Sequence, residues 1–371
     1  MRDALWKDSP LFMGTTKFEK AAGINNILVS GGAGFIASWL VRHLAIQYPH
    51  YNVICFDAMD YCASINNIGY VLDNCTNFKF VKGDVTKTVE VTAVLKEYAI
   101  DTIIHMAALS HVDRSFGGQS SEFTAVNAYG THVLLECARA ANVSRFIHMS
   151  TDEVYGEVNH DDVALLESAI LAPTNPYAAS KAAADMLANA YYKSYKMPII
   201  IVRCNNVYGP HQFPEKIIPK FICLLDNGGK CFVHGDGKNT RRYLYAGDAV
   251  DALDTVLHFG DVGQIYNIGT TDELSNLNLC KMLLQKLGVE EKDYNKWIEF
   301  TGDRPFNDQR YAIDASRLSS LGWVQKMEFE YGIQITIDWY QKFGSAWWGD
   351  LSDILTAFPV GHLHVNGVHN I

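Results

Sequence analysis

Two clusters of side chains that can carry protons lie close together in the middle of the sequence. The first is the run from Ser150 to Glu153, and the second is the pair Tyr177 and Lys181. Residues four positions apart lie on one face of a helix, so the Lys181 ammonium is expected one turn from the Tyr177 phenol. That ammonium favours the phenolate, because the ordinary tyrosine pKa of about 10 makes the phenol a poor base at neutral pH. Tyr177 is therefore a candidate general base, although the same spacing is common on ordinary amphipathic helices.

The element that must hold Tyr177 and Lys181 is predicted to be a helix from residue 176 to residue 195. Asn175 can cap its N-terminus, and Pro176 suits its first position. The chain from Ala182 onward contains few residues that would break a helix. The sequence therefore predicts a rigid support for both side chains.

Asp152 and Glu153 are neighbouring carboxyl groups that directly follow a predicted buried strand. Ligands bind at the carboxyl ends of strands in open α/β sheets, so Ser150, Thr151 and the two acids are expected to face a binding crevice. Two adjacent carboxyls can be held in different protonation states, one acting as acid and the other as base. The alternative interpretation is a solvated acidic turn, and a cofactor site nearby favours the catalytic interpretation.

A glycine-rich turn near the start of the chain is the second functional pattern. The apolar run Asn26–Ser30 is followed by the sequence GGAGFIA at residues 31–37 and then by a helical pattern. Small residues let the backbone approach a pyrophosphate, and the free N–H groups of the first helical turn bind its charge. The candidate dinucleotide contacts are therefore Gly31, Gly34, Phe35 and Ile36.

Asp57 supports the dinucleotide interpretation because it ends a second predicted strand about twenty residues further on. A carboxylate there can accept both ribose hydroxyls of the adenosine and would repel a 2′-phosphate, so NAD is favoured over NADP. Asp84 and Val85 follow the next strand and are placed to meet the adenine, although Asp84 is equally typical of a turn. Ala107 and Ala108 follow the strand after that, where small side chains leave room for the cofactor.

The order of the predicted elements indicates the fold class. Strands at 78–82, 102–106, 145–150 and 198–203 alternate with helices at 89–98, 122–141 and 176–195. Such alternation is typical of an α/β fold of Rossmann type, a doubly wound parallel sheet with helices on both faces. We expect a flexible leader at 1–24 and an NAD-binding domain at 25–205. A smaller C-terminal α/β region at 206–350 would mainly bind substrate, and residues 351–371 would form a tail.

Composition excludes several classes of function. The 371 residues carry a formal net charge of −10 and contain no run of lysine or arginine, which argues against a nucleic-acid or anionic-membrane partner. The eight cysteines are scattered without zinc-site spacing, so we expect reduced thiols and no metal site. The leader has no apolar segment of signal-peptide type, and no stretch is long enough to span a bilayer. A cytoplasmic protein is therefore expected.

Three cations in the second half of this acidic chain are candidates for phosphate binding, namely Lys216, Arg241 and Arg304. Arginine pairs bidentately with phosphate oxygens, so the three could converge on a diphosphate. Each is also explained as an ordinary surface charge, because the sequence alone does not show convergence.

Together these motifs resemble those of the extended short-chain dehydrogenase/reductases, and within them the nucleoside diphosphate glucose 4,6-dehydratases. The resemblance covers about residues 26–350, and its marks are STDEVYG at 150–156, Tyr177 with Lys181, NVYGP at 206–210, FPEK at 213–216, and the segments around Arg241 and Arg304. Related epimerases and decarboxylases share the Tyr/Lys pair but usually lack adjacent Asp and Glu after the threonine. The two carboxyls are therefore the discriminating feature.

The resemblance implies a mechanism on a sugar nucleotide. Tyr177, with Thr151 bonded to the same oxygen, would remove the C4 hydroxyl proton while NAD⁺ accepts the C4 hydride, and Lys181 would bind the nicotinamide ribose and lower the phenol pKa. Glu153 would then remove the C5 proton, and Asp152 would protonate the departing C6 hydroxyl. The hydride would return to C6, so NAD must stay tightly bound and is regenerated in each turnover.

The resemblance also implies the ligand contacts. The cofactor would touch Ser150, Tyr177 and Lys181 as well as the glycine-rich turn. The substrate would touch Thr151, Asn206, Lys216, Arg241, Arg304 and Asn307. The helices at 122–141 and 176–195 would pair in a homodimer as a four-helix bundle, although packing within one chain explains their alanine-rich faces equally well.

Finer marks favour one substrate. Phe306-Asn307 and WWGD at 347–350 resemble the dehydratase part of plant and fungal UDP-rhamnose-forming enzymes. They imply conversion of UDP-glucose to UDP-4-keto-6-deoxyglucose, within rhamnose or other deoxysugar biosynthesis. The alternatives are a dTDP-glucose 4,6-dehydratase and a nucleotide-sugar 4-epimerase.

Overall fold

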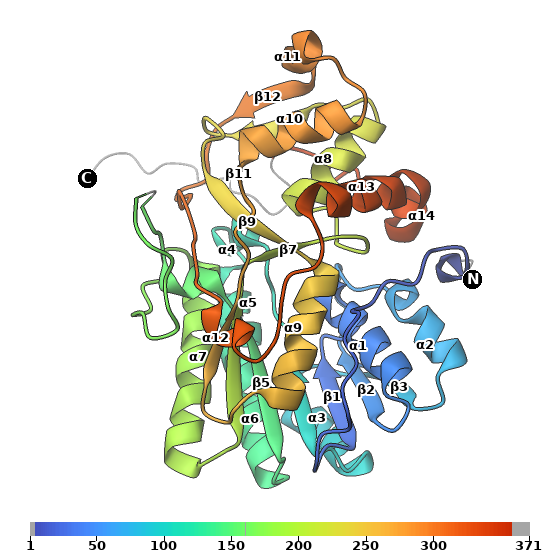
Figure 1. Cartoon of the computed structure of the whole chain (residues 1–371), viewed down its shortest axis with the longest axis vertical. Helices are drawn as coiled ribbons and strands as arrows, with labels where there is room; N and C mark the ends of the chain where they lie inside the picture. Colours follow the sequence, from blue (N-terminus) through green and yellow to red (C-terminus); the bar gives the residue numbers. More distant parts are fainter. Residues whose placement is uncertain (1–3, 160, 358–371) are drawn as a thin grey trace.

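One seven-stranded parallel sheet organises the fold (Figure 1). The structure is a computed structural model that describes residues 4–159 and 161–357. Neighbouring strands are parallel throughout this sheet. From edge to edge the strands are β10 (Ile265–Ile268), β6 (Ile199–Cys204), β5 (Arg145–Thr151), β4 (Thr102–His105), β1 (Asn26–Ser30), β2 (Asn52–Asp57) and β3 (Phe78–Lys82). The predicted doubly wound parallel sheet is confirmed.

Helices cover both faces of the sheet, and each face has its own hydrophobic core. α1 (Phe35–Gln47) and α9 (Ala246–Phe259) belong to one core. α3 (Thr88–Glu97), α6 (Gly130–Ala140) and α7 (Pro176–Tyr195) belong to the other. Strand β1 serves both, because Ile27 and Val29 point into the first core and Leu28 into the second. A strand buried on both faces reads as a continuous apolar run, which is the pattern that the sequence displayed.

Both long helices of the second core were predicted, but one of them is less regular than expected. α7 begins at Pro176, as expected, and the Asn175 side chain accepts the Ala178 N–H at 2.8 Å. The helix predicted at 122–141 consists of α5 (Ser120–Phe123), a π-helical stretch (Thr124–Tyr129) and α6 in direct succession. The π-helical stretch shifts the register of the helix faces where this element contacts α7.

A smaller α/β region lies beyond one end of the main sheet (Figure 1). Its sheets are β11 (Glu273–Ser275), β9 (Thr240–Tyr245) and β7 (Asn206–Tyr208), and β12 (Ile298–Thr301) with β8 (Cys231–His234). Its main helices are α8 (Ile217–Asp226), α10 (Asn276–Lys286), α13 (Phe329–Trp339) and α14 (Ser345–Trp348). This region also contains the short helix α11 (Tyr294–Trp297), and short helices elsewhere are α2 (Gly69–Asn74), α4 (Val112–Ser115) and α12 (Ser316–Ser319). The chain after residue 205 does not stay in this region, because α9 and β10 return to the main sheet.

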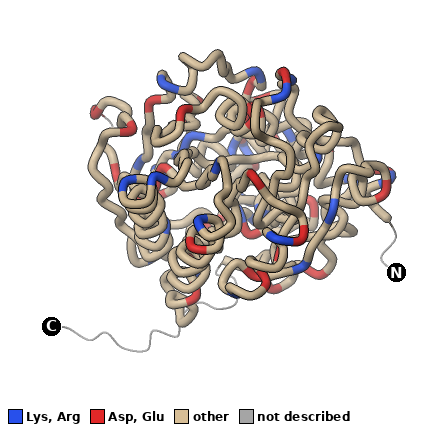
Figure 2. Tube along the Cα trace, turned by 90° about the horizontal axis from the view of Figure 1, so that it is seen from below, with Lys and Arg blue, Asp and Glu red and all other residues tan. Residues whose placement is uncertain are grey.

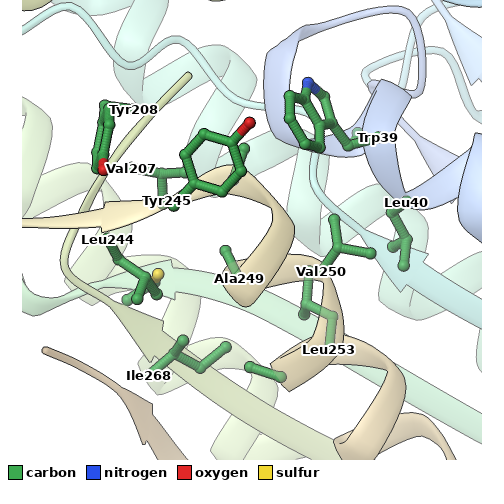
Figure 3. Close-up of a cluster of buried hydrophobic side chains, with 14 of the residues drawn as sticks. Trp39, Leu40, Val207, Tyr208, Leu244, Tyr245, Ala249, Val250, Leu253 and Ile268 are labelled. Carbon is green, nitrogen blue, oxygen red and sulfur yellow. The ribbon is translucent and has the colours of Figure 1, made fainter. Parts of the chain in front are cut away.

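Aromatic and aliphatic side chains join the two regions in one core (Figure 3). The ring of Trp39 on α1 meets the ring of Tyr245 on β9 edge-on, with centroids 5.4 Å apart. Tyr208 on β7 packs against the same Tyr245 at 5.6 Å. Val250 on α9 belongs to this cluster as well. The packing fixes the smaller region against the main sheet, so side chains from both can meet in a defined geometry.

The leader makes contacts that the sequence did not predict. Residues 12–21, which we call the N-terminal strap, lie against α1 and α9. The hydroxyl of Thr16 donates to the Asp254 carboxylate at 2.7 Å, and the hydroxyl of Thr15 donates to Asp251 at 2.7 Å. The Phe12 ring stacks on Trp39 with centroids 5.2 Å apart. A flexible leader was expected, but this part of it is held by specific bonds within the described structure.

The remaining sequence predictions concern the tail, the cysteines and the surface. Leu351 is buried at the start of the tail, while residues 358–371 lie outside the described residues. All eight cysteines are free thiols. Acidic and basic residues are interspersed along the trace (Figure 2). Within the described residues, no helix has the length and apolar character that crossing a bilayer requires.

Candidate active site

Tyr177 and Lys181 are both buried on α7, next to the end of strand β5. The Lys181 ammonium donates to the Met149 carbonyl oxygen at 2.7 Å. Burial lowers the pKa of Lys181 to about 8, and Asp185 opposes this effect. Burial raises the pKa of Tyr177, as does the charge of Glu153, while a hydrogen bond to Thr151 lowers it. The expected lowering of the Tyr177 pKa by Lys181 does not dominate, because burial and the Glu153 charge act in the opposite direction. The catalytic roles of Tyr177 and Lys181 stay predictions.

The two carboxyls that follow Thr151 have different surroundings. Asp152 is fully buried, accepting the Asn205 amide at 2.6 Å and the Thr151 hydroxyl at 3.2 Å. Burial raises the pKa of Asp152 to about 7, and the charge of Glu153 adds to the effect. A group with this pKa can hold a proton at neutral pH and donate it.

Glu153 lies among cations instead. Burial raises its pKa, but the charges of Arg241 and Arg304 oppose this, and the Asn175 amide donates to it at 3.3 Å. The Tyr311 hydroxyl lies 3.5 Å from the same oxygen. Burial is still the largest cause, so the Glu153 pKa is raised overall, and what distinguishes Glu153 from Asp152 is that pocket cations oppose this effect. Adjacent carboxyls with different neighbours can be held in different protonation states, which is what acid and base chemistry needs.

A pocket of about 940 Å³, partly open to solvent, adjoins Glu153. This volume includes space that is open to solvent. The lining includes all five positions predicted for the sugar nucleotide beyond Thr151, which are Asn206, Lys216, Arg241, Arg304 and Asn307. The convergence that sequence could not show is therefore present in the structure, while the binding roles of these residues stay predictions.

The pocket cations are held in place by neighbouring oxygens. Asn307 accepts hydrogen bonds from Arg241 at 3.2 Å and from Arg304 at 2.6 Å, so one amide aligns two guanidinium groups. Arg304 also pairs with Asp113 at 3.1 Å. Lys216 donates to the Ser110 carbonyl at 2.5 Å. Since Ser110 and Asp113 follow strand β4, these bonds connect the main sheet to the smaller region across the pocket.

The glycine-rich turn has the geometry that close approach of a dinucleotide requires. Gly31 has φ +73°, and a Cβ atom there would lie 2.8 Å from the Ala107 Cα. Helix α1 begins at Phe35, so its first N–H groups, including that of Ile36, point to the space beside the turn. Gly34 precedes it in the capping position. These residues fit a pyrophosphate group, which gains both close backbone contact and the charge of the helix N-terminus.

Asp57 ends strand β2 beside this turn, as predicted. Its two oxygens accept the Ala33 N–H at 2.9 Å and the Met59 N–H at 2.7 Å. Burial raises its pKa, and these two bonds oppose that effect. Asp84 accepts the Thr86 N–H at 2.8 Å, which is the turn role that the sequence allowed. The cofactor contacts predicted for Asp57, Asp84, Val85, Ala107, Ala108 and Ser150 stay predictions.

Several residues of the site were missed by the sequence reasoning. Lys220 and Glu215 line the pocket, and burial lowers the pKa of Lys220 to about 8. Lys220 follows Lys216 by four residues, so helical spacing could have found it. Tyr311 donates a short hydrogen bond to Asp308 next to Glu153, and nothing in the local sequence signalled that contact. Among the described residues, no group of three or more His, Cys, Asp or Glu could hold a metal ion.

Comparison with known proteins gives the family. The family model described as GDP-mannose 4,6 dehydratase matches residues 28–336. The chain belongs to this family. The resemblance to nucleotide-sugar 4,6-dehydratases drawn from the sequence is thereby confirmed, together with the Rossmann-type fold of the family.

The individual relatives of this family differ in their nucleotide. A trifunctional UDP-glucose 4,6-dehydratase/UDP-4-keto-6-deoxy-D-glucose 3,5-epimerase/UDP-4-keto-L-rhamnose-reductase of Arabidopsis thaliana is 48% identical over 90% of this chain, which spans about half of the plant protein. The human dTDP-D-glucose 4,6-dehydratase is 46% identical over 90% of this chain and 95% of its own length. Similar family members thus carry names that refer to either base, and the comparisons do not distinguish UDP from dTDP.

A solved structure agrees with the fold and the cofactor prediction. DesIV, a dTDP-glucose 4,6-dehydratase of Streptomyces venezuelae solved with NAD and TYD bound, has a TM-score of 0.82 and 39% identity. The alignment covers 87% of this chain and 99% of DesIV. NAD, the cofactor predicted from the glycine-rich turn and Asp57, is thus the cofactor bound in a relative of the same fold.

Proposed function

We propose that this chain catalyses the NAD-dependent dehydration of UDP-glucose to UDP-4-keto-6-deoxyglucose. The observation that carries the proposal is the pair Asp152 and Glu153, two buried carboxyls of which Asp152 has a pKa of about 7 and Glu153 faces the cations of the pocket. An enzyme that only oxidises and reduces C4 has no use for a second acid and base. Loss of water from C5 and C6 needs both.

The residues of the site divide the reaction among them. NAD, held by the turn at Gly31 and Gly34 and by Asp57, would supply the hydride acceptor for C4 and the hydride donor for C6. Tyr177 would take the C4 hydroxyl proton, assisted by the Thr151 hydroxyl, which lowers the Tyr177 pKa. A ketone at C4 acidifies the C5 proton, so a carboxylate suffices as the next base.

Glu153 would remove that C5 proton, while Asp152 would give its proton to the departing C6 hydroxyl. Asn205 supports the second step, because its amide holds Asp152 at 2.6 Å and so fixes the direction of the acid. Arg241 and Arg304 would bind the diphosphate. This binding would neutralise the diphosphate charge and place the sugar against Glu153. The sequence of proton transfers needs no metal ion.

The choice of UDP over dTDP rests on the segments at 306–307 and 347–350, which resemble UDP-sugar enzymes. Asn307 lies between Arg241 and Arg304, so this segment belongs to the site itself. dTDP-glucose is the second candidate, because the human dTDP-glucose enzyme matches this chain over nearly its whole length. The two bases differ by one methyl group, which is worth only about 1 kcal/mol in an apolar pocket.

A competition experiment tests the function and the substrate together. Purified protein without added NAD would be mixed with equal amounts of UDP-glucose and dTDP-glucose, and the masses of the products would be measured by mass spectrometry. Faster loss of one water from the UDP sugar is expected. Faster loss from the dTDP sugar would overturn the choice of base, and no loss of water from either, also after adding NAD, would overturn the dehydratase.

We propose in addition that the protein is a homodimer through α7 and the helix formed by α5 to α6. Apolar side chains are exposed on these elements, with Met186 60% exposed, Tyr129 54% and Tyr195 54%. On α7, Met186 forms an exposed stripe at helical spacing with Ala179, Ala183 and Ala190, which a second copy could cover, giving a four-helix bundle. Light scattering of the wild type and of Met186→Glu tests this, since the charge should convert a dimer to a monomer.

A further inference from the structure

The loop that follows strand β2 has both of its ends on the predicted dinucleotide site. We call residues 58–64 the β2 loop, and it begins directly after Asp57. The Asp57 carboxylate accepts the N–H of Met59 in this loop at 2.7 Å and the N–H of Ala33 in the glycine-rich turn at 2.9 Å. At the far end of the loop, the Ser64 N–H donates to the Ala33 carbonyl oxygen at 3.2 Å. The β2 loop therefore borders the dinucleotide site at both ends.

Tyr61, in the middle of the β2 loop, contacts the smaller region instead. Its hydroxyl donates to a Glu215 carboxylate oxygen at 3.1 Å. Its ring meets that of Phe213 edge-on, with centroids 5.5 Å apart. The Arg114 guanidinium on α4 lies over the same Tyr61 ring, 4.0 Å from its centroid, which is a cation–π distance. We call Tyr61, Arg114 and Glu215 the clasp, because they connect three separate segments of the chain.

The partners of Tyr61 in the clasp are themselves held in place. Arg114 donates to the Gln119 side-chain oxygen through two of its nitrogens, at 3.3 and 3.0 Å. Glu215 is only 6% exposed, and within the described residues the Tyr61 hydroxyl is the one hydrogen-bond donor to its carboxylate. A buried carboxylate costs free energy when its donor is lost. The folded protein therefore favours the position of the β2 loop in which Tyr61 reaches Glu215.

We propose that the clasp retains the bound NAD, with Tyr61 as a positioning residue that keeps the β2 loop in place beside Asp57. The inference rests on the proposed function in one respect, which is that the hydride taken from C4 returns to C6 and the cofactor is not replaced between turnovers. A loop fastened from outside the dinucleotide site meets this need, because the loop opens only when the bond from Tyr61 to Glu215 breaks. Glu215 also lines the sugar-nucleotide pocket, so the clasp joins the two ligand sites.

Loss of the clasp should speed the release of NAD, since none of the three clasp side chains is a predicted cofactor contact. A hydrogen bond to a charged group changes an equilibrium by about tenfold to a hundredfold. The open form of the β2 loop should become more populated by such a factor when the bond is removed, and NAD should then leave about tenfold faster or more. Removing either partner breaks the same bond, so removing both should add little.

Exchange of bound NAD for isotope-labelled NAD tests the proposal on the purified holoprotein without any turnover. The labelled fraction is measured by mass spectrometry after free NAD has been removed. Tyr61→Phe keeps the ring under Arg114 and loses only the hydroxyl, and it should exchange NAD about tenfold faster than the wild type. Glu215→Leu should also exchange faster, and the double variant should be no faster than the faster single variant. Exchange by Tyr61→Phe at the wild-type rate would overturn the proposal.

Two control variants separate the clasp from a general loss of stability. Tyr70→Phe removes the hydroxyl of another half-buried tyrosine, whose ring meets that of Trp6 at 6.2 Å instead of the smaller region, and it should exchange NAD like the wild type. Thr16→Val weakens the N-terminal strap and should lower the melting temperature without faster exchange. If Tyr61→Phe does not fold because Glu215 has lost its donor, the double variant lacks both groups and is compared with the wild type instead.

The NAD exchange rate and the dehydration assay can fail independently. Faster exchange in the clasp variants of a protein that dehydrates no sugar nucleotide would retain the role of the clasp and overturn the proposed function. Dehydration by a wild type whose clasp variants exchange NAD at an unchanged rate would retain the proposed function and overturn the role of the clasp.

Discussion

Replacing Asp152 by asparagine tests the division of labour between the two adjacent carboxyls. The amide keeps the size of the side chain but has no acidic proton for the departing C6 hydroxyl. Burial raises the pKa of Asp152 to about 7, so about half of the wild-type molecules hold this proton at pH 7. General acid catalysis contributes about 10²–10⁴-fold, which corresponds to about 3–5 kcal/mol. The rate of water loss should fall by that factor in Asp152→Asn.

The assay separates oxidation from dehydration. Removal of hydrogen from C4 uses Tyr177 and Thr151, so Asp152→Asn should still reduce its bound cofactor when substrate is added. NADH absorbance should rise and persist, while mass spectrometry detects the dehydrated product only slowly. The exposed loop variant Asp161→Asn is the control and should turn over like the wild type. Failure to accumulate NADH in Asp152→Asn, or turnover within threefold of the wild type, would refute the assignment.

The pH dependence provides an independent check of the same assignment. Because the Asp152 pKa is raised, the protonated form is present below about pH 7 and is lost as the pH rises through that value. The wild-type kcat/KM should therefore fall about fivefold between pH 7 and pH 8. The residual rate of Asp152→Asn should not show this fall. A wild-type profile that is flat across this interval contradicts the reasoning.

Three further perturbations have expected outcomes. Gly31→Ala places a methyl group on a backbone with φ +73° and against Ala107. The protein should lose NAD during gel filtration, and its free energy of unfolding should fall by about 1–3 kcal/mol. Arg304→Lys keeps the charge but not the fork that binds phosphate, so KM should rise about tenfold with kcat little changed in steady-state kinetics. Thr16→Val removes the donor to Asp254 and should lower the free energy of unfolding by about 1–3 kcal/mol in urea titration, at unchanged activity per folded molecule.

The parts of the fold that could be predicted are those whose signals are local. Asn175 and Pro176 place the start of α7 correctly because a cap acts within one turn. The N-terminal strap could not be predicted, because Thr15 bonds to Asp251, which lies 236 residues further along the chain. The π-helical stretch at 124–129 has no clear sequence signal either, since its residues suit an ordinary helix.

The difference between local signals and contacts of distant segments also explains which features of the site could be predicted. Spacing alone indicated Tyr177 with Lys181, because both lie on one helix. It also indicated a dyad at Asp152 and Glu153, but not which carboxyl is the acid. That difference comes from the burial of Asp152, which raises its pKa, and from the pocket cations that oppose burial at Glu153, and both depend on other segments of the chain. Sequence patterns thus identify the reacting groups, whereas the contacts that tune them require the folded chain.

The position of strand β10 at the edge of the main sheet affects how the chain can fold during synthesis. The outer side of β6 pairs with β10, and Arg145 at the start of β5 donates to the carbonyls of Leu257 and Gly260. A nascent chain that has reached only residue 205 therefore presents β6 as a bare sheet edge, and such edges recruit other strands. The ribosome must deliver more than sixty further residues before that edge is closed at Ile268. The dinucleotide-binding half is consequently not a module that can be excised, and a fragment ending at 205 should aggregate.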